Sequence, residues 1–112
     1  MTGRLSASVE ATSIIRRAEA SGDFAAVLHK GDADRGALVI LVRSRGNFAA
    51  CLERVLDLDG AYRWTAGGPS DDEDGKVAQF LARKVEFDPD LWVIELDVAQ
   101  PERFIAETTS TG

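Results

Sequence analysis

One segment near the end of the chain constrains the fold more than any other. Residues 87–97 read Phe-Asp-Pro-Asp-Leu-Trp-Val-Ile-Glu-Leu-Asp. The Asp-Pro pair predicts the end of a helix, because the residue before a proline avoids the helical region. The run from Leu91 to Leu96 then begins with four apolar side chains, as expected of a strand that is covered on both faces. We therefore predict a buried final strand at the centre of a sheet.

Two other segments predict helices. The first runs from Ala7 to Ser21, and the second begins at Ser70–Glu73, whose Ser-x-x-Glu spacing fits a capping box, and ends at Asp88. Ser6 and Ser8 are both candidates for the N-cap of the first helix. In both segments apolar residues recur at spacings of three and four, which is the pattern of one helix face: Ala7, Ala11, Ile14, Ile15 and Ala18 in the first, and Val77, Phe80, Leu81 and Val85 in the second.

Between these helices, four segments have the composition of strands: 24–30, 37–42, 48–55 and 61–65. The loop between the first two, Gly-Asp-Ala-Asp-Arg-Gly at 31–36, supplies the Asp and Gly residues that a tight hairpin requires. Because consecutive strands with short connections favour antiparallel pairing, we predict a four-stranded antiparallel meander.

The predicted fold is α+β, with an N-terminal helix, the meander, a second helix and the central final strand, and with the helices on one face of the sheet. We predict a single domain over residues 1–105, in which a short turn near its end places the apolar side chains of Phe104 and Ile105 against the core. Residues 106–112, rich in Thr and Ser, have nothing to bury and are predicted to be a flexible C-terminal tail.

The composition restricts the class of protein. A chain of 112 residues, 45% apolar and 29% charged, is long enough for one core. No apolar run reaches the roughly 18 residues that a membrane helix needs. The start of the chain lacks the apolar stretch of a secretory signal, so we expect a cytoplasmic protein. Cys51 and His29 are the only cysteine and histidine, so we expect no internal disulfide, metal, cofactor or histidine-dependent triad.

The charge argues against a nucleic-acid partner. The formal net charge is −6, and residues 70–97 carry nine acids against three bases. A protein that binds nucleic acid needs a clustered basic surface, because neutralised phosphates supply most of the attraction. The alternative is a local basic face made by Arg16, Arg17, Arg43 and Arg45.

Several short motifs point to one family. They are Ser13–Glu19 (Ser-Ile-Ile-Arg-Arg-Ala-Glu), His29–Asp32 with Gly36, Phe87–Glu95 and Arg103–Ile105. Together they resemble the small alphaproteobacterial proteins catalogued as domain of unknown function 1491. The resemblance runs from about Leu5 to Ile105, and its most specific pieces are the Arg-Arg pair and the Asp-Pro-Asp-Leu-Trp segment. It implies a bacterial, cytoplasmic, single-domain protein with no assigned activity and no catalytic residues to carry over.

Six residues are candidates for contact with an anion or a partner: Arg16, Arg17, His29, Asp32, Asp90 and Trp92. Adjacent arginines can bind a carboxylate or phosphate through bidentate hydrogen bonds, although Arg16 and Arg17 also suit a solvated helix face. His29 precedes a turn, and Asp32 is the carboxylate near enough in sequence to orient it. Trp92 belongs in a core by its apolar surroundings, whereas a half-exposed tryptophan would mark an interface.

The acidic residues have structural explanations in the sequence. Asp90 with Glu95 and Asp97 resembles the acidic motif of restriction-type nucleases, but Asp97 stands where a lysine is required, so we interpret Asp90 as a turn residue. The run Asp71–Asp74 suits a helix start, since neighbouring helical side chains point about 100 degrees apart and cannot converge on one cation. Cys51 lies in an alternating apolar strand and is predicted to be an inert packed thiol.

Two classes of function remain. The favoured one is a small non-enzymatic protein-interaction or regulatory module that forms a homodimer or binds a protein through an open sheet edge or an apolar patch. The alternative is a small-molecule or anion-binding protein, or a small enzyme, that uses a cleft lined by the arginines, His29 and the acids.

Overall fold

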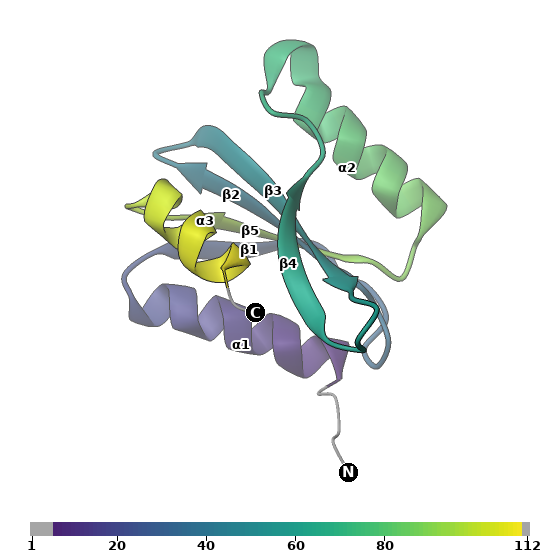
Figure 1. The fold of residues 1–112 in the computed structure, drawn as a ribbon. Coiled ribbons are helices and arrows are strands. Elements are labelled where there is room, and N and C mark those ends of the chain that lie inside the picture. The colour runs from purple at the N-terminus through teal and green to yellow at the C-terminus, as the bar shows by residue number, and fades with distance from the viewer. Residues whose placement is uncertain (1–5, 111–112) are drawn as a thin grey trace.

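The computed structural model describes residues 6–110 of the chain and has the α+β fold that the sequence predicts (Figure 1). Its elements, in chain order, are helix α1 (Ala7–Ala20), strands β1 (Phe24–His29), β2 (Leu38–Ser44), β3 (Asn47–Leu56) and β4 (Tyr62–Gly67), the 3-10 turn η1 (Glu73–Gly75), helix α2 (Lys76–Phe87), strand β5 (Trp92–Asp97) and helix α3 (Pro101–Thr109). The predicted order of helix, four strands, helix and strand is confirmed, and helix α3 stands where a short turn and the start of a tail were predicted.

The five strands form one mixed sheet in the order β1-β5-β2-β3-β4. Strand β5 runs parallel to β2 and antiparallel to β1, so the predicted central position of the final strand is confirmed. The predicted hairpin between β1 and β2 is wrong, because β5 lies between them, and the antiparallel meander is confined to β2, β3 and β4. The physical reason is that the first three residues of β5 are buried, which favours a central position in the sheet where a strand pairs with each of its two edges.

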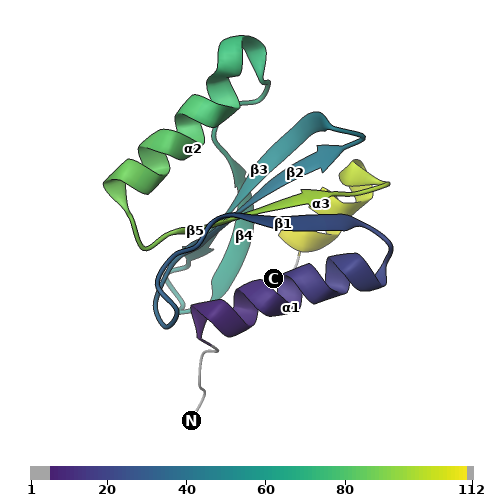
Figure 2. The ribbon, with the colours of Figure 1, turned by 180° about the vertical axis from the view of Figure 1, so that it is seen from behind.

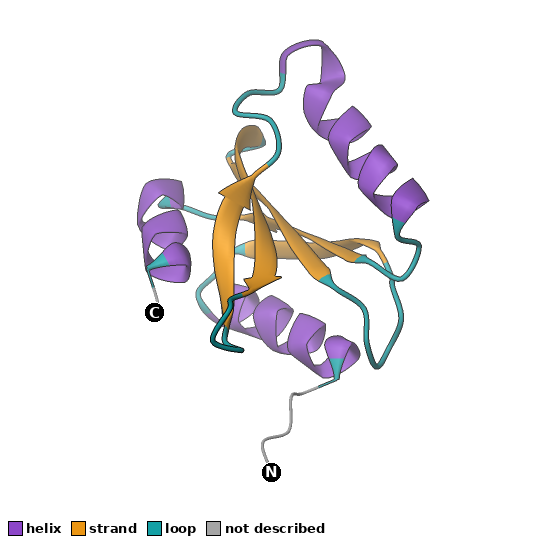
Figure 3. Cartoon of the chain, turned by 45° about the vertical axis from the view of Figure 1, so that its right-hand side comes forward, coloured by secondary structure: helices purple, strands orange, loops and turns teal. Residues whose placement is uncertain are grey.

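Helices cover both faces of the sheet, not one face as predicted (Figure 3). Alternate side chains of β2 divide between the faces: Leu38, Ile40 and Val42 join the core under α1 and α3, whereas Val39 and Leu41 face α2. Strands that are apolar on both sides require cover on both sides. Figure 2 shows the opposite view, with β1 along one edge of the sheet above α1.

The helix starts use neighbouring polar side chains. Ser6 is the N-cap of α1, where its side chain accepts a hydrogen bond from the amide of Val9 at 3.4 Å. The predicted capping box at Ser70 does not form, because α2 begins later, after a turn in which Asp74 and Gly75 have positive φ. The carboxylate of Asp72 instead accepts from the amide of Val77 at 3.2 Å.

Helix α3 extends to Thr109, so residues 106–109 of the predicted tail are helical. Its hydrophobic side chains Phe104 and Ile105 pack against the core, as the sequence indicates, and Thr109 Oγ1 donates to the carbonyl of Ile105 at 2.8 Å. Two parts of these predictions lie outside the described residues. They are residues 1–5 of the predicted domain, where the sequence indicates no secretory signal, and residues 111–112 of the predicted tail. None of the helices within residues 6–110 is long and apolar enough to cross a membrane.

Candidate functional site

Four of the six predicted contact residues gather where the loop after β1 crosses the start of β5. We call this place the β5 junction: His29, Asp32, Asp90 and Trp92. The amide of Asp32 donates to the carbonyl of Asp90 at 2.9 Å, and Trp92 Nε1 donates to the carbonyl of Asp32 at 2.7 Å. His29 Nδ1 lies 2.7 Å from the carbonyl oxygen of Leu91. Because a carbonyl can only accept, Nδ1 carries the proton in the neutral ring.

The side chains of His29, Asp32 and Trp92 hydrogen-bond to backbone groups of the β5 junction itself. The Asp32 carboxylate accepts from the amides of Asp34 and Arg35 at 3.0 and 2.7 Å, which is a turn-forming arrangement. His29 makes its hydrogen bond to a backbone carbonyl rather than to a carboxylate that would orient it as a base. Trp92 is 5% exposed, so its ring belongs to the core.

The paired arginines lie elsewhere. The N-terminal end of α1 contacts the loop of the junction, where the amide of Ser8 donates to the carbonyl of Ala33 at 2.9 Å. Arg16 is nine residues beyond Ala7 on that helix, which is about 13 Å along the axis. The two arginines and the β5 junction therefore do not share one cleft, and a catalytic site that combines them is not formed.

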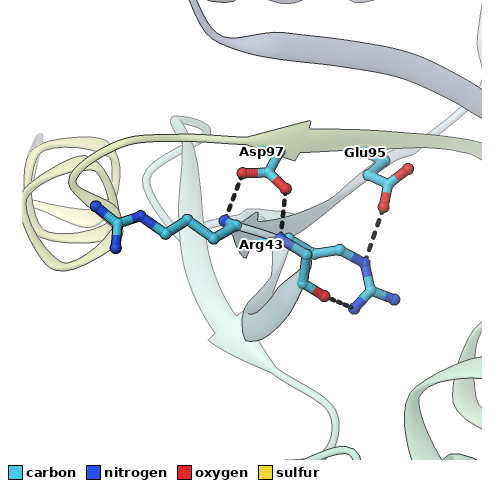
Figure 4. Close-up of polar contacts among 5 residues, drawn as sticks. Arg43, Glu95 and Asp97 are labelled. Atoms are coloured by element: carbon cyan, nitrogen blue, oxygen red, sulfur yellow. Dashed lines mark hydrogen bonds and ion pairs between the residues drawn. The ribbon is translucent and has the colours of Figure 1, made fainter.

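The carboxylates at the end of β5 are also occupied by the chain's own groups (Figure 4). Glu95 Oε2 pairs with Arg43 Nε at 2.8 Å. Asp97 accepts from the amides of Arg45 and Gly46, both at 2.8 Å, in the β2–β3 turn where these two residues have positive φ. Both acids thus fix the sheet and its turn, in place of the metal ligation that a nuclease motif would require. Within residues 6–110 no group of three or more His, Cys, Asp or Glu side chains is placed to hold a metal ion.

Cys51 is buried on the α2 side of β3. Burial, with a smaller contribution from the nearby Glu53 carboxylate, raises the pKa of its thiol to about 11. The thiolate that nucleophilic catalysis requires is therefore scarce at neutral pH.

A hollow of about 410 Å³ lies between α1 and α3, over the sheet. We call it the α1–α3 cleft. Ile40, Leu96 and Trp64 form its apolar floor, while Arg17 and Asp23 contribute charge on the α1 side and Glu107 on the α3 side. The sequence singles out Arg17 alone among these residues. Glu107 is missed because its segment is expected to be an unstructured tail, and no local signal places Trp64 beside α3.

Another hollow, of about 420 Å³, lies between the edge strand β1 and helix α2. We call it the β1–α2 groove. Its walls are mainly aliphatic, and they include one predicted contact residue, His29: the lining is Leu28, His29, Leu81, Ala82, Val85, Glu86 and Val93. The spacing of apolar residues in α2 identifies Leu81 and Val85 as core-facing, but only the sheet order shows that they stand beside an open edge.

The resemblance in the motifs is supported by comparison with known proteins. The chain matches the family described as "Protein of unknown function (DUF1491)" over residues 5–106. The chain belongs to this family. The family description assigns no activity, so membership in the family does not indicate a reaction or a ligand.

Solved structures of DUF1491 family proteins from one bacterium, and of a protein from another bacterium, have a similar fold. The NMR structure of a DUF1491 family protein from Caulobacter crescentus is 31% identical, with a TM-score of 0.81, and the match covers 98% of this chain and 100% of that one. The crystal structure of a DUF1491 protein from the same organism gives 29% identity, a TM-score of 0.79, and coverage of 90% and 94%. The solution structure of protein Atu0922 from A. tumefaciens is 27% identical, with a TM-score of 0.66, and the match covers 86% of this chain and 87% of that one. A comparison with curated proteins gives no significant match.

Proposed function

We propose that this DUF1491 protein is a non-enzymatic interaction module of the bacterial cytoplasm, and that its interface is the open edge of strand β1. The partner we propose is a second copy of the chain, paired strand to strand. The single unpaired cysteine suits a reducing compartment, and the net charge of −6 disfavours nucleic acid as the partner.

The observation that carries this proposal is the exposure of apolar side chains on β1. Within residues 6–110 the strand has one neighbour in the sheet, β5, so its other edge presents backbone groups that no strand of this part of the chain pairs with. Phe24 is 58% exposed, Val27 42% and Leu28 50%. Natural proteins protect sheet edges with charges, and an apolar edge strand is therefore a site where another strand is expected to add.

The β1–α2 groove extends this apolar surface. Leu28 belongs to both β1 and the groove, and the groove continues over Leu81 and Val85 toward the end of α2. There Phe87, the last residue of the helix, is 93% exposed. An added strand would thus find backbone partners along β1 and apolar side chains on the α2 side of the sheet.

A second copy fits this edge because the strand is self-complementary. Side chains directly opposite each other in an antiparallel pair lie on the same face of the sheet. Pairing about Ala26 places Phe24 of one copy opposite Leu28 of the other. It also brings the end with Asp23 toward the end with Lys30, so that opposite charges meet. A six-residue strand pair is a small interface, and we expect a weak dimer.

The test is light scattering after size exclusion, with concentrations up to about 1 mM so that a weak dimer is populated. We expect the wild-type mass to rise from monomer toward dimer with concentration. Phe24→Lys should hold the protein in the monomer, because each copy then brings a charge into the interface. Leu56→Lys is the matched control: Leu56 is 60% exposed, but it lies at the end of β3, so this variant should dimerise normally.

A mixture of two variants tests the register. Phe24→Lys and Leu28→Glu should each be monomeric alone, whereas a mixture should form a heterodimer. In that heterodimer the introduced lysine of one copy would face the introduced glutamate of the other, and the wild-type pair would remain at the second site. A strictly monomeric wild type at the highest concentration would overturn the proposal. Equal loss of dimer in the Leu56→Lys control would also overturn it, because the interface would then not be β1.

A further inference from the structure

The α1–α3 cleft combines an apolar floor with charges of both signs at its rim. Its floor of Ile40, Leu96 and Trp64 is continuous with the main core, and its volume of about 410 Å³ lies within the range of small-molecule sites. Phe104 of α3 forms part of the wall. A ligand in this cleft would need an apolar body that contacts the floor and polar groups that reach the rim.

The positive group at the rim is unoccupied. Within residues 6–110, the guanidinium of Arg17 makes no hydrogen bond or ion pair. Arg43, Arg54, Arg63 and Arg103 each pair with a carboxylate of the same chain, whereas Arg16, Arg35, Arg45 and Arg83 share the unpaired state of Arg17. Among the unpaired arginines within residues 6–110, Arg17 is the one that lines the cleft. A guanidinium at the rim of an apolar cleft without a partner suits the carboxylate of a ligand, which it can bind through two parallel hydrogen bonds.

The two acids at the rim each have a free oxygen for a cation. Asp23 uses Oδ1 to accept from the amide of Ala99 at 3.4 Å, and Glu107 uses Oε2 to pair with Arg103 Nε at 3.1 Å. No hydrogen bond is formed by Asp23 Oδ2 or Glu107 Oε1 within the part of the chain that the structure describes. A simple anion would gain from Arg17 but would be repelled by these acids, whereas a ligand with both charges can satisfy both sides.

We propose that the α1–α3 cleft binds an apolar or aromatic α-amino acid as its zwitterion. The ligand carboxylate pairs with Arg17, the ammonium group pairs with Asp23 or Glu107, and the side chain lies on Ile40, Leu96 and Trp64. The exposed side chains of β1 do not line this cleft, and Asp23, which precedes β1, is the residue that both this proposal and the β1 interface of the proposed function use.

The test is a titration of the protein with L-phenylalanine, followed by the backbone amide signals in NMR. We expect shifts at the amides of Ala18, Ile40, Leu96 and Phe104. Arg17→Gln should weaken binding about ten-fold, which corresponds to the loss of a charge-assisted hydrogen bond. Arg16→Gln is the matched control, because Arg16 and Arg17 both line a groove on α1 beside Val9 and Thr12, but Arg16 is absent from the cleft.

Two ligand analogues separate the charges. Phenylpropionate lacks the ammonium group and phenethylamine lacks the carboxylate, so each should bind at least several-fold more weakly than L-phenylalanine. The proposal is overturned if L-phenylalanine shifts no cleft amide, if an analogue binds equally well, or if Arg16→Gln and Arg17→Gln weaken binding alike. Dimer formation is read from the mass and ligand binding from the amide shifts, so failure of this proposal and failure of the β1 dimer are distinguishable.

Discussion

The two faces of the sheet are covered in different ways. Under α1 and α3, within residues 6–110, eleven buried residues form one continuous cluster, whereas the buried residues under α2 divide into two clusters of three. Helix α2 itself buries only Val77. The first face therefore holds most of the apolar core that stabilises the fold, and the second face is covered loosely enough to leave the β1–α2 groove beside an open edge.

The polar contacts follow the same division. On the α1 side, Arg54 pairs with Glu10 and is 11% exposed in its side chain. On the α2 side, Lys84 pairs with Glu53 and is 37% exposed. Ion pairs with more exposure contribute less to stability, because water screens them. The comparison indicates that the α1 side determines stability and that the α2 side can change its contacts at low cost.

The largest expected effect comes from truncating matched leucines on the two faces. Leu96→Ala on the α1 side should lower the free energy of unfolding by about 4 kcal/mol, because it leaves a cavity in a continuous core. Leu41→Ala on the α2 side should cost about 2 kcal/mol, since the half-buried Phe48 and Phe80 can move into the space. Urea denaturation measures both, and equal losses would remove the distinction between the faces.

The next effect concerns the two ion pairs. Arg54→Ala should cost about 1.5 to 3 kcal/mol, because it leaves the Glu10 carboxylate without its partner, and Glu10 Oε1 already lacks a hydrogen bond within residues 6–110. The contact of Arg54 with the Tyr62 ring, 4.8 Å from its centroid, is lost as well. Lys84→Ala should cost less than about 1 kcal/mol. The same denaturation measurement checks both variants, and a larger loss for Lys84→Ala would contradict the comparison.

Two glycines test how tightly the β5 junction is packed relative to the α2 side. Gly31→Ala should cost about 1 to 3 kcal/mol, because the added Cβ would overlap the backbone carbonyl of Asp90, which cannot move independently. Gly67→Ala is the control, since the atom it meets is the flexible carboxylate end of Glu53. Its cost should be below about 1 kcal/mol. Thermal melts measure both variants. Equal melting temperatures would show that the backbone of the β5 junction can shift to accept the added Cβ.

The smallest effect at neutral pH concerns Cys51. Its pKa is raised to about 11 from an ordinary value of 9.0, so the folded protein retains the thiol proton where the unfolded chain has lost it. The contribution of this thiol to the free energy of unfolding is therefore fully present below pH 9 and is lost as the pH rises toward 11. Cys51→Ala should therefore flatten the decline in unfolding free energy over this range. If the variant declines as steeply as the wild type, the thiol is not the titrating group.

Much of the fold is predictable from local patterns because local physics produces it. The spacing of apolar residues identifies α1 and α2, and the four consecutive apolar residues from Leu91 identify a strand buried on both faces. The turn composition of 31–36 correctly predicts a break between strands, but the prediction that it joins paired strands is wrong. A loop that closes a hairpin and a loop that spans an inserted strand require the same Gly and Asp residues.

The candidate sites are predictable only in part. Adjacent arginines at 16 and 17 indicate a candidate anion contact, but only the fold shows that Arg17 lines the α1–α3 cleft while Arg16 does not. His29 and Asp32 are close in sequence and in space, yet their hydrogen bonds go to backbone groups, which no spacing in the sequence reveals.

The sequence by itself determined that α1 and α2 are helical and that five segments are extended, that β5 is buried, and that the chain has few groups for histidine or cysteine chemistry. Helix α3 was not predicted. Only the tertiary structure decided the order of the strands, the helices on both faces, and therefore the open edge at β1. The physical reason is that periodicity records which side chains of a segment are buried, whereas the identity of the neighbour that buries them depends on how all segments pack together.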